Sequence, residues 1–173
     1  MKKLNKIQSK CKKIKIVLTD VDGVLTDGGR YYNTKGEVLK KFHVHDGMAI
    51  SILLRNNIKT CIITKENSLI TQKWAKDMKI NKVYYNSIKK EDKLQQICKK
   101  YNVKSFEIAF IGDDVNDLKL MKLVGLSVCP LDGIPMIKKT VDYVCKNPSG
   151  KGAFREMTEL ILLNKLPKSI TWY

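Results

Sequence analysis

The chain has 173 residues, of which 43% are hydrophobic and 29% are charged, a balance that predicts one globular domain and argues against a disordered chain. No apolar run is long enough to cross a bilayer, and no signal sequence is recognisable, so a cytoplasmic location is expected. The five cysteines are widely spaced and form no C-x-x-C pair, which indicates free thiols and not a zinc or redox site.

The formal net charge of +16 suggests an anionic partner. Only three of the 33 basic residues are arginines, however, and the lysines are spread over almost every segment. Proteins that read nucleic-acid sequence rely on arginine for two-pronged contacts to bases and phosphates. Attraction of small anionic substrates is therefore expected rather than specific nucleic-acid binding. The lysine-rich stretch over residues 1–14 is expected to be a solvated, frayed extension.

Short apolar runs alternate with amphipathic stretches along nearly the whole chain, which predicts strands that alternate with helices. This alternation implies βαβ units, so the expected fold class is α/β, with a Rossmann-like parallel sheet covered by helices on both faces. The expected elements, in chain order, are a strand over 14–19, a projecting hairpin over 30–42, a helix over 48–56, a strand over 60–64, a helix over 69–78 with Ser68 as its N-cap, a strand over 82–85, a helix over 91–101, a strand over 107–111, a helix through 118–123, edge strands over 126–129 and 143–145, and a helix over 153–163.

Polar residues follow the ends of these predicted strands. Asp20 and Asp22 end the first strand, Thr64 ends the second, Lys93 begins the helix after the third, and Asp113 follows the fourth. In a parallel sheet, ligands bind outside the carboxyl ends of the strands. Each feature alone could be a turn, a helix cap or a surface lysine. Their occurrence on consecutive strand ends predicts an active site at this edge of the sheet.

The residue types suit phosphoryl transfer. Asp20 can attack phosphorus in line and form an aspartyl-phosphate, and Asp22 can protonate the leaving oxygen and later activate water. Asp113 and Asp20 together suit Mg²⁺, which prefers a few carboxylates plus water and phosphate oxygens. Thr64 and Lys93 are expected to bind the phosphate oxygens and to offset the negative charge.

These motifs resemble those of the haloacid dehalogenase superfamily. The first is Asp20-x-Asp22-Gly23-Val-x-Thr26-Asp27, followed by Thr64, Lys93 and Gly112-Asp113-Asp114-x-x-Asp117. The resemblance implies that Asp22 also belongs to the metal site, that Asn116 contacts substrate, and that Asp114 and Asp117 support the metal ligands from behind.

Further matches are similar to one branch of that superfamily, which has no cap domain and contains phosphatases of 3-deoxy-D-manno-octulosonate 8-phosphate (KDO 8-phosphate) and of nonulosonate 9-phosphates. The resemblance implies a phosphatase domain over 15–164, preceded by the extension over 1–14 and followed by a tail over 165–173. The matching stretches are Asp27-Gly28-Gly29, Tyr31-Tyr32, Gly36-Glu37, Lys41-Phe42, Asp46-Gly47, Val124-Gly125-Leu126 and residues 150–156.

Members of this branch form tetramers, in which the hairpin and the C-terminal tail of neighbouring subunits cover the open site. By resemblance, the hairpin over 30–42 and the stretch over 150–156 would do so here. The spacing agrees with the absence of a lid, because the intervals from Asp22 to Thr64 and from Thr64 to Lys93 leave room for only a hairpin and a few elements.

The substrate is inferred from departures within this branch. The octulosonate phosphatases usually have Thr-Gly-Arg after the second strand and arginines on the two adjacent helices, whereas this chain has Thr64-Lys65-Glu66, Ser51 and Trp74. The motif Thr64-x-Glu66 is similar to that of the nonulosonate 9-phosphate phosphatases, and Glu66 could accept hydrogen bonds from sugar hydroxyls. Glu66 could equally be an acid that is favoured near a helix N-terminus by the helix dipole. The remaining residues expected to contact substrate are Asp22, His43, His45, Asp46, Gly47 and Lys93.

The sequence therefore predicts a Mg²⁺-dependent phosphatase that removes the terminal phosphate of a 2-keto-3-deoxy sugar acid. A nonulosonate 9-phosphate is favoured as substrate, and KDO 8-phosphate is the alternative. A non-catalytic assembly module of a sialic-acid activation system is a further alternative. It is disfavoured because Asp20, Asp22, Lys93 and Asp113 are all present.

Overall fold

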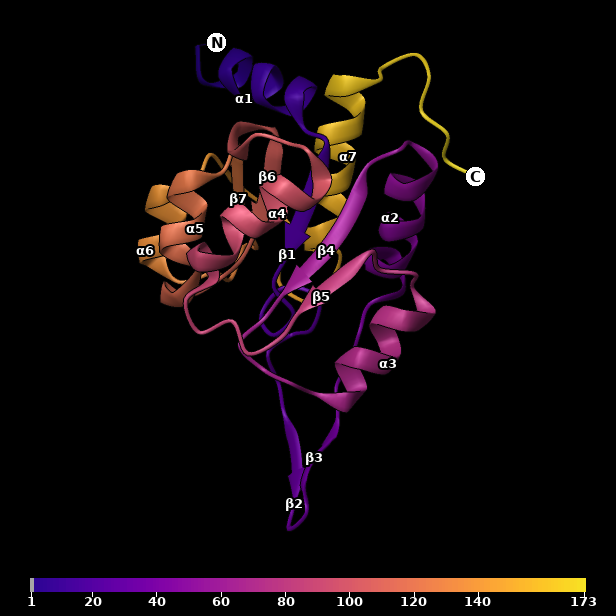
Figure 1. Cartoon of the computed structure of the whole chain (residues 1–173), viewed down its shortest axis with the longest axis vertical. Coiled ribbons are helices and arrows are strands. Elements are labelled where there is room, and N and C mark those ends of the chain that lie inside the picture. Colours follow the sequence, from indigo (N-terminus) through magenta and orange to yellow (C-terminus); the bar gives the residue numbers. More distant parts are fainter. Residues whose placement is uncertain (1) are drawn as a thin grey trace.

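A computed structural model describes residues 2–173, with side chains from Asn5 onward. Its centre is a parallel sheet of six strands in the order β5-β4-β1-β6-β7-β8, which confirms the predicted fold class (Figure 1). The predicted edge strand over 126–129 lies inside the sheet, because β8 pairs with its outer side. The strands are β1 (Ile16–Thr19), β4 (Lys59–Ile63), β5 (Lys82–Tyr84), β6 (Ile108–Ile111), β7 (Leu126–Cys129) and β8 (Tyr143–Val144).

The central strands are apolar on both faces. In β1, Val17 packs into one hydrophobic cluster while its neighbours Ile16 and Leu18 pack into another on the opposite face. This pattern follows from the alternation of side chains along a strand, and a parallel sheet covered on both faces has few polar positions to offer. The two cores leave only the strand ends open for polar side chains.

Helices cover both faces of the sheet. One face packs against α1 (Lys2–Lys13), α2 (Val44–Arg55), α3 (Leu69–Asp77) and α7 (Ala153–Lys165). The other face packs against α4 (Leu94–Tyr101), α5 (Leu118–Leu123) and α6 (Pro135–Thr140), and α6 is a short helix that the periodicity did not predict. Short 3₁₀ turns precede three elements: η1 (Lys90–Lys93), η2 (Ser105–Glu107) and η3 (Val115–Asp117).

The basic N-terminal segment is part of the domain, so the expectation of a frayed extension is wrong for the residues described. Ile7 and Cys11 are buried in the core beneath α1, and α1 packs along α7. Lys10 also forms an ion pair of 2.5 Å with Asp142. Burial of the apolar stripe of α1 therefore holds the helix against the domain, although its lysines favour contact with water. Met1, at the start of the predicted extension, lies outside the described residues.

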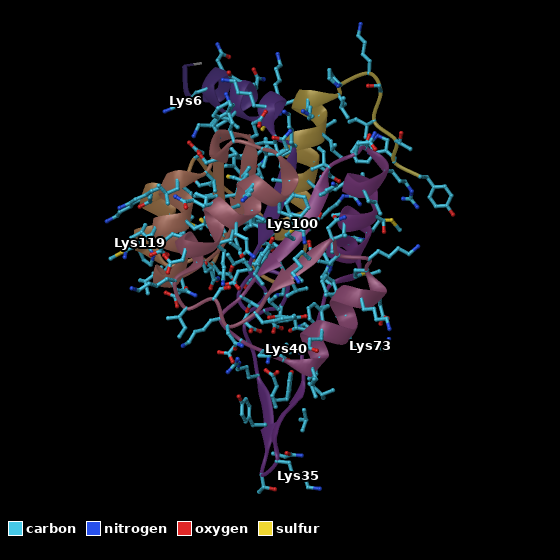
Figure 2. All side chains as sticks on the ribbon, viewed as in Figure 1. Lys6, Lys35, Lys40, Lys73, Lys100 and Lys119 are labelled. Atoms are coloured by element: carbon cyan, nitrogen blue, oxygen red, sulfur yellow. The ribbon has the colours of Figure 1, made fainter. Side chains whose placement is uncertain are left out.

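The predicted hairpin is present as β2 (Tyr31–Asn33) and β3 (Gly36–Leu39), and it projects from the carboxyl edge of the sheet (Figure 1). Its labelled tip residue Lys35 lies far from Lys6, Lys100 and Lys119, so lysines are spread over the molecule and form no single labelled patch (Figure 2). Within residues 2–173, no helix has the length and apolar character needed to cross a membrane.

Candidate active site

Asp20 lies immediately after β1, with its side chain turned into the protein. Its carboxylate forms an ion pair of 2.6 Å with Nζ of Lys90 and accepts a hydrogen bond of 2.7 Å from the N–H of Val21. Lys90 is fully buried and also donates to Oδ1 of Asp117 at 2.6 Å. Burial alone would lower the pKa of Lys90, but the two carboxylates outweigh it and raise the pKa. Lys90 is therefore a permanent buried cation behind Asp20.

The predicted lysine of this site, Lys93, is the wrong residue. Lys93 lies on the surface in a hollow formed with Asn86, Ser87 and Lys89, whereas Lys90 makes the contact with Asp20. Leu94 and Ile97 are buried on α4. Extending their spacing one turn back reaches Lys90, and this apolar periodicity was the signal in the sequence that distinguishes the two lysines.

Asp113 follows β6 and closes against the Asp20 loop. Its Oδ2 lies 2.1 Å from the point that a Cβ on Gly23 would occupy, and Gly23 has a φ of +84°. Glycine is therefore required there both for backbone conformation and for the approach of Asp113. Gly112 is required for a similar reason, since a Cβ there would lie 2.3 Å from Oδ2 of Asp117. Asp117 uses that oxygen to accept the N–H groups of Asp113 and Asp114.

One ligand atom from each of Asp20, Asp113 and Asp117 lies within 4.8 Å of the others. Burial, followed by the charge of Asp20, raises the pKa of Asp113 to about 8. Burial also raises the pKa of Asp20, although Lys90 opposes this. The raised pKa values show that Asp20 and Asp113 ionise reluctantly when they lie side by side. No described residue donates a hydrogen bond to the carboxylate of Asp113. A divalent cation bound between the two carboxylates would compensate their charge. Both oxygens of Asp117 accept hydrogen bonds, one from Lys90 and the other from the N–H groups of Asp113 and Asp114, so Asp20 and Asp113 are the better candidates to bind the cation.

Asp22 is not one of the three carboxylates in this cluster, and its expected place in the metal site stays a prediction. Its Oδ1 pairs with Lys40 and lies 3.3 Å from the hydroxyl of Thr26. Its Oδ2 is buried and has no hydrogen-bond partner in the described structure. Asp22 therefore lines the hollow as a separate carboxylate. Lys40 and Thr26 hold one of its oxygens, and the other has no hydrogen-bond partner among the described residues.

These acids lie at the bottom of a hollow of about 200 Å³ at the carboxyl edge of the sheet. Thr64 is buried at the end of β4, and its hydroxyl accepts the N–H of Glu66 at 3.2 Å. At the rim, Arg30 from the hairpin pairs with Glu66 at 3.2 Å. The hollow is lined by Asp20, Asp22, Arg30, Thr64, Lys65, Glu66, Asp113, Asp114 and Asn116, so most of the predicted site residues are brought together.

The stretch over 43–47 does not reach this hollow. His43 and Gly47 line a second, more apolar hollow of about 360 Å³ with Phe42 and Trp74, whose rings stack at 4.3 Å. His45 is exposed. These positions were expected to contact substrate, and in a single subunit they lie apart from Asp20.

Asp46 is fully buried and is corrected from a substrate contact to a structural one. Its carboxylate accepts the N–H groups of Gly152 at 3.2 Å and of Arg155 at 2.8 Å, so it stabilises the start of α7. Burial raises the pKa of this carboxyl despite those hydrogen bonds.

The stretch over 150–156 packs against its own subunit's core. Gly150 packs against the backbone of Thr26 and Asp27, and Glu156 accepts N–H groups of Lys146 and Asn147. These contacts anchor the stretch within its own subunit, and its place over a neighbouring site stays a prediction. The tail after α7 also folds back, since Thr171 and the side chain of Asn56 exchange two hydrogen bonds.

Sequence reasoning missed three cations at the site: Lys90, Lys40 and Arg30. Ser68 shows a related effect, because it stands at the expected N-cap of α3 but makes no capping bond; its hydroxyl donates instead to Glu37 of the hairpin at 2.8 Å. Contacts between the hairpin and the body depend on how the two pack, and no local pattern in the sequence encodes them.

Comparison with known proteins agrees with this geometry. Residues 30–157 match the family model of haloacid dehalogenase-like hydrolases. The KDO 8-phosphate phosphatase of Haemophilus influenzae is 38% identical over 156 residues, which cover 90% of this chain and 87% of that protein. Its cobalt-bound structure has a TM-score of 0.88 at 37% identity, covering 90% of this chain and 91% of that one. The structure of the KDO 8-phosphate phosphatase of Moraxella catarrhalis, in complex with magnesium ion, phosphate ion and KDO, has a TM-score of 0.89 at 34% identity. The match covers 93% of this chain and 92% of that one.

Proposed function

Because the chain belongs to the haloacid dehalogenase-like hydrolases, in the branch without a cap domain, we propose that it is a phosphatase of KDO 8-phosphate. It is an enzyme that hydrolyses phosphoric monoesters, with Mg²⁺ as cofactor. The observation that carries the reaction type is the placement of Asp20 between the buried cation of Lys90 and the neighbouring acid of Asp113.

In the proposed reaction, Asp20 is the nucleophile. Lys90 and the Val21 N–H each bind one oxygen of its carboxylate and hold it at the strand end, in the lining of the hollow. Lys90 is buried behind Asp20 and offsets the negative charge that phosphate adds. The hydroxyl of Thr64, which lines the hollow at the end of β4, would bind a phosphate oxygen. Asp22 is the acid that protonates the leaving sugar oxygen and the base that then deprotonates water.

Asp20 and Asp113 would hold Mg²⁺, which would neutralise phosphate charge and align the ester with the nucleophile. The fit rests on this chain's own residues. Asp113 reaches Asp20 only because Gly23 has no side chain, and burial keeps both acids reluctant to ionise until a cation is present. Asp117 supports this arrangement through Lys90 and the Asp113 N–H.

The preference for a nonulosonate 9-phosphate is replaced here. The similar relatives are KDO 8-phosphate phosphatases, which favour the former alternative. The argument against that substrate was the loss of three arginines, at the positions of Glu66, Ser51 and Trp74. In the structure Glu66 holds Arg30 at the rim of the same hollow, 3.2 Å away. An arginine and the adjacent Lys65 are therefore available to a sugar carboxylate from a different direction.

The test is phosphate release with Mg²⁺ from KDO 8-phosphate, from nonulosonate 9-phosphates with and without an N-acetyl group, and from a simple alkyl phosphate. We expect kcat/KM to be highest for KDO 8-phosphate, and Asp20→Asn to abolish release from every ester by at least about 10⁴-fold. A higher kcat/KM for a nonulosonate would overturn the substrate but not the reaction. Full activity of Asp20→Asn would overturn the mechanism.

A neighbouring subunit is the proposed partner of the hairpin. Tyr31, Tyr32 and Leu39 expose more than half of their surface although they are large apolar residues, and such clustered exposure is typical of a protein interface. We propose a homotetramer in which the hairpin covers a neighbouring site. Light scattering should then give four times the chain mass, and Tyr32→Lys with Leu39→Lys should dissociate it; a wild-type monomer with full activity would contradict the proposal.

A further inference from the structure

Lys40, at the base of the hairpin, is an internal cation that the reaction described so far does not use. No part of its side chain is exposed, and its Nζ pairs with Oδ1 of Asp22 and lies 3.3 Å from Oε1 of Glu37. Figure 2 shows Lys40 where the hairpin joins the body, while Lys35 lies at the tip. A lysine that gives up all of its water needs such partners, so its conformation is determined by the two carboxylates.

The network continues into the body of the protein. The second oxygen of Glu37 accepts the hydroxyl of Ser68 at 2.8 Å, at the start of α3. Lys40 is therefore held between the loop after β1 and the residues that precede α3. The carboxylate of Asp22 cannot rotate without breaking its contact with this fixed ammonium group.

The two oxygens of Asp22 differ because of Lys40. Oδ1 is occupied by Lys40 and by the hydroxyl of Thr26. Oδ2 is buried and has no hydrogen-bond partner, with Nη2 of Arg30 no nearer than 3.9 Å. Lys40 therefore leaves Oδ2 as the oxygen of Asp22 without a hydrogen-bond partner in the described part of the chain.

We propose that Lys40 is a positioning residue that makes Oδ2 of Asp22 the proton-transferring oxygen; this rests on the proposed phosphatase function. In the first step, a carboxylate oxygen of Asp20 bonds to phosphorus as the ester P–O bond breaks. The electron pair of that bond goes to the sugar oxygen, which takes the proton from Oδ2 and leaves as an alcohol. In the second step, water bonds to phosphorus, its proton returns to Oδ2, and the Asp20–phosphorus bond breaks to release phosphate.

Lys40→Met tests the proposal by the dependence on the leaving group. An alkyl phosphate needs the proton of Asp22, whereas p-nitrophenyl phosphate releases a stable phenolate without it. Because kcat/KM reports steps through departure of the leaving group, we expect kcat/KM to fall about 100-fold for KDO 8-phosphate and β-glycerol phosphate but less than about 5-fold for p-nitrophenyl phosphate. Lys40→Arg should restore most of the alkyl-phosphate activity.

The matched control is Lys41→Met. Lys41 lies next to Lys40 on the same arm of the hairpin, but it is exposed and pairs with Asp27 at 2.6 Å. Its kcat/KM should change equally little for both ester types. Equal losses for alkyl and aryl phosphates in a Lys40→Met protein that keeps the wild-type circular dichroism spectrum, or no loss, would overturn the proposal. Wild-type protein that releases phosphate from no ester would instead overturn the proposed function, which the wild-type arm detects separately.

Discussion

The carboxyl edge of the sheet has a buried ion pair and the region beneath α1 a partly buried one, and the pKa values of their acids shift in opposite directions. At the carboxyl edge, burial raises the pKa of Asp113 to about 8, with the charge of Asp20 adding to it. Beneath α1, burial also acts to raise the pKa of Asp142, but hydrogen bonds from Lys10 and from the Ser127 N–H outweigh it and lower the pKa.

The difference separates a functional region from a structural one. Asp142 has donors for its charge within its own subunit, so ionisation favours folding. Asp113 lacks such donors among the described residues, so its ionised form is stable only with an added cation. Without a bound cation, the closely spaced acids at the carboxyl edge thus lower the free energy of unfolding. The same acids form the binding site, and such a cost in stability is common at active sites.

The largest expected effect comes from exchanging Lys90. Lys90→Met should lower kcat/KM for phosphate esters by about 10³-fold, because Asp20 loses the cation that orients it. It should also destabilise the fold by about 3–5 kcal/mol, because Asp20 and Asp117 stay buried without a cation to compensate their charge. Steady-state kinetics and urea unfolding measure the two effects.

Lys93→Met is the matched control for that experiment. Lys93 lies in a surface hollow away from Asp20, so its exchange should change kcat/KM by less than about 2-fold. A larger loss in Lys93→Met than in Lys90→Met would return the catalytic role to Lys93.

The second effect is a pH-dependent stabilisation by Mg²⁺. The pKa of Asp113 is about 8 in the folded protein but about 3.9 in an unfolded chain. As the pH rises from about 4 to about 8, the unfolded state loses this proton while the folded state keeps it, so the free protein becomes less stable. Mg²⁺ competes with the proton, and its increase in Tm should be about 5 °C larger at pH 8 than at pH 6.

Asp113→Asn separates this effect from general salt stabilisation. The variant has no proton to displace at this position, so the difference between the two pH values should shrink in thermal unfolding with Mg²⁺ to the part that Asp20 contributes. An equal Mg²⁺-dependent rise in Tm at pH 6 and pH 8 in the wild type would contradict the raised pKa of Asp113 and the competition between its proton and Mg²⁺.

The smallest effect concerns the region beneath α1. Asp142→Asn should reduce the free energy of unfolding by about 1–2 kcal/mol at pH 7, with kcat/KM unchanged. Because the pKa of Asp142 is lowered in the folded state, its contribution is present above the unfolded pKa of about 3.9 and is lost as the pH falls further. Urea unfolding at pH 7 and pH 3 should show a larger difference at pH 7; a variant as stable as wild type at pH 7 would remove the contrast between the two regions.

Much of the fold and of the site could be predicted because the signals are local. Continuous apolar runs predicted β1, β4 and β6, and the acids that follow them predicted a site at one edge of the sheet. The choice between Lys90 and Lys93 failed because both lie in one 3₁₀ turn, where a shift of three residues changes which side chain is buried. The prediction that Asp46 contacts substrate failed for a different reason, because its partners Gly152 and Arg155 are over a hundred residues away in the chain.

The sequence by itself determined the parallel sheet, the family and the acids Asp20, Asp22 and Asp113, because strand periodicity and strand-end motifs are read over a few neighbouring residues. Only the tertiary structure decided that Lys90 contacts Asp20, that Lys40 holds Asp22, and that Arg30 meets Glu66 at the rim. Those pairs join elements far apart in the chain. Which cation reaches which carboxylate depends on the packing of whole helices and of the hairpin, and burial then fixes the charge of each.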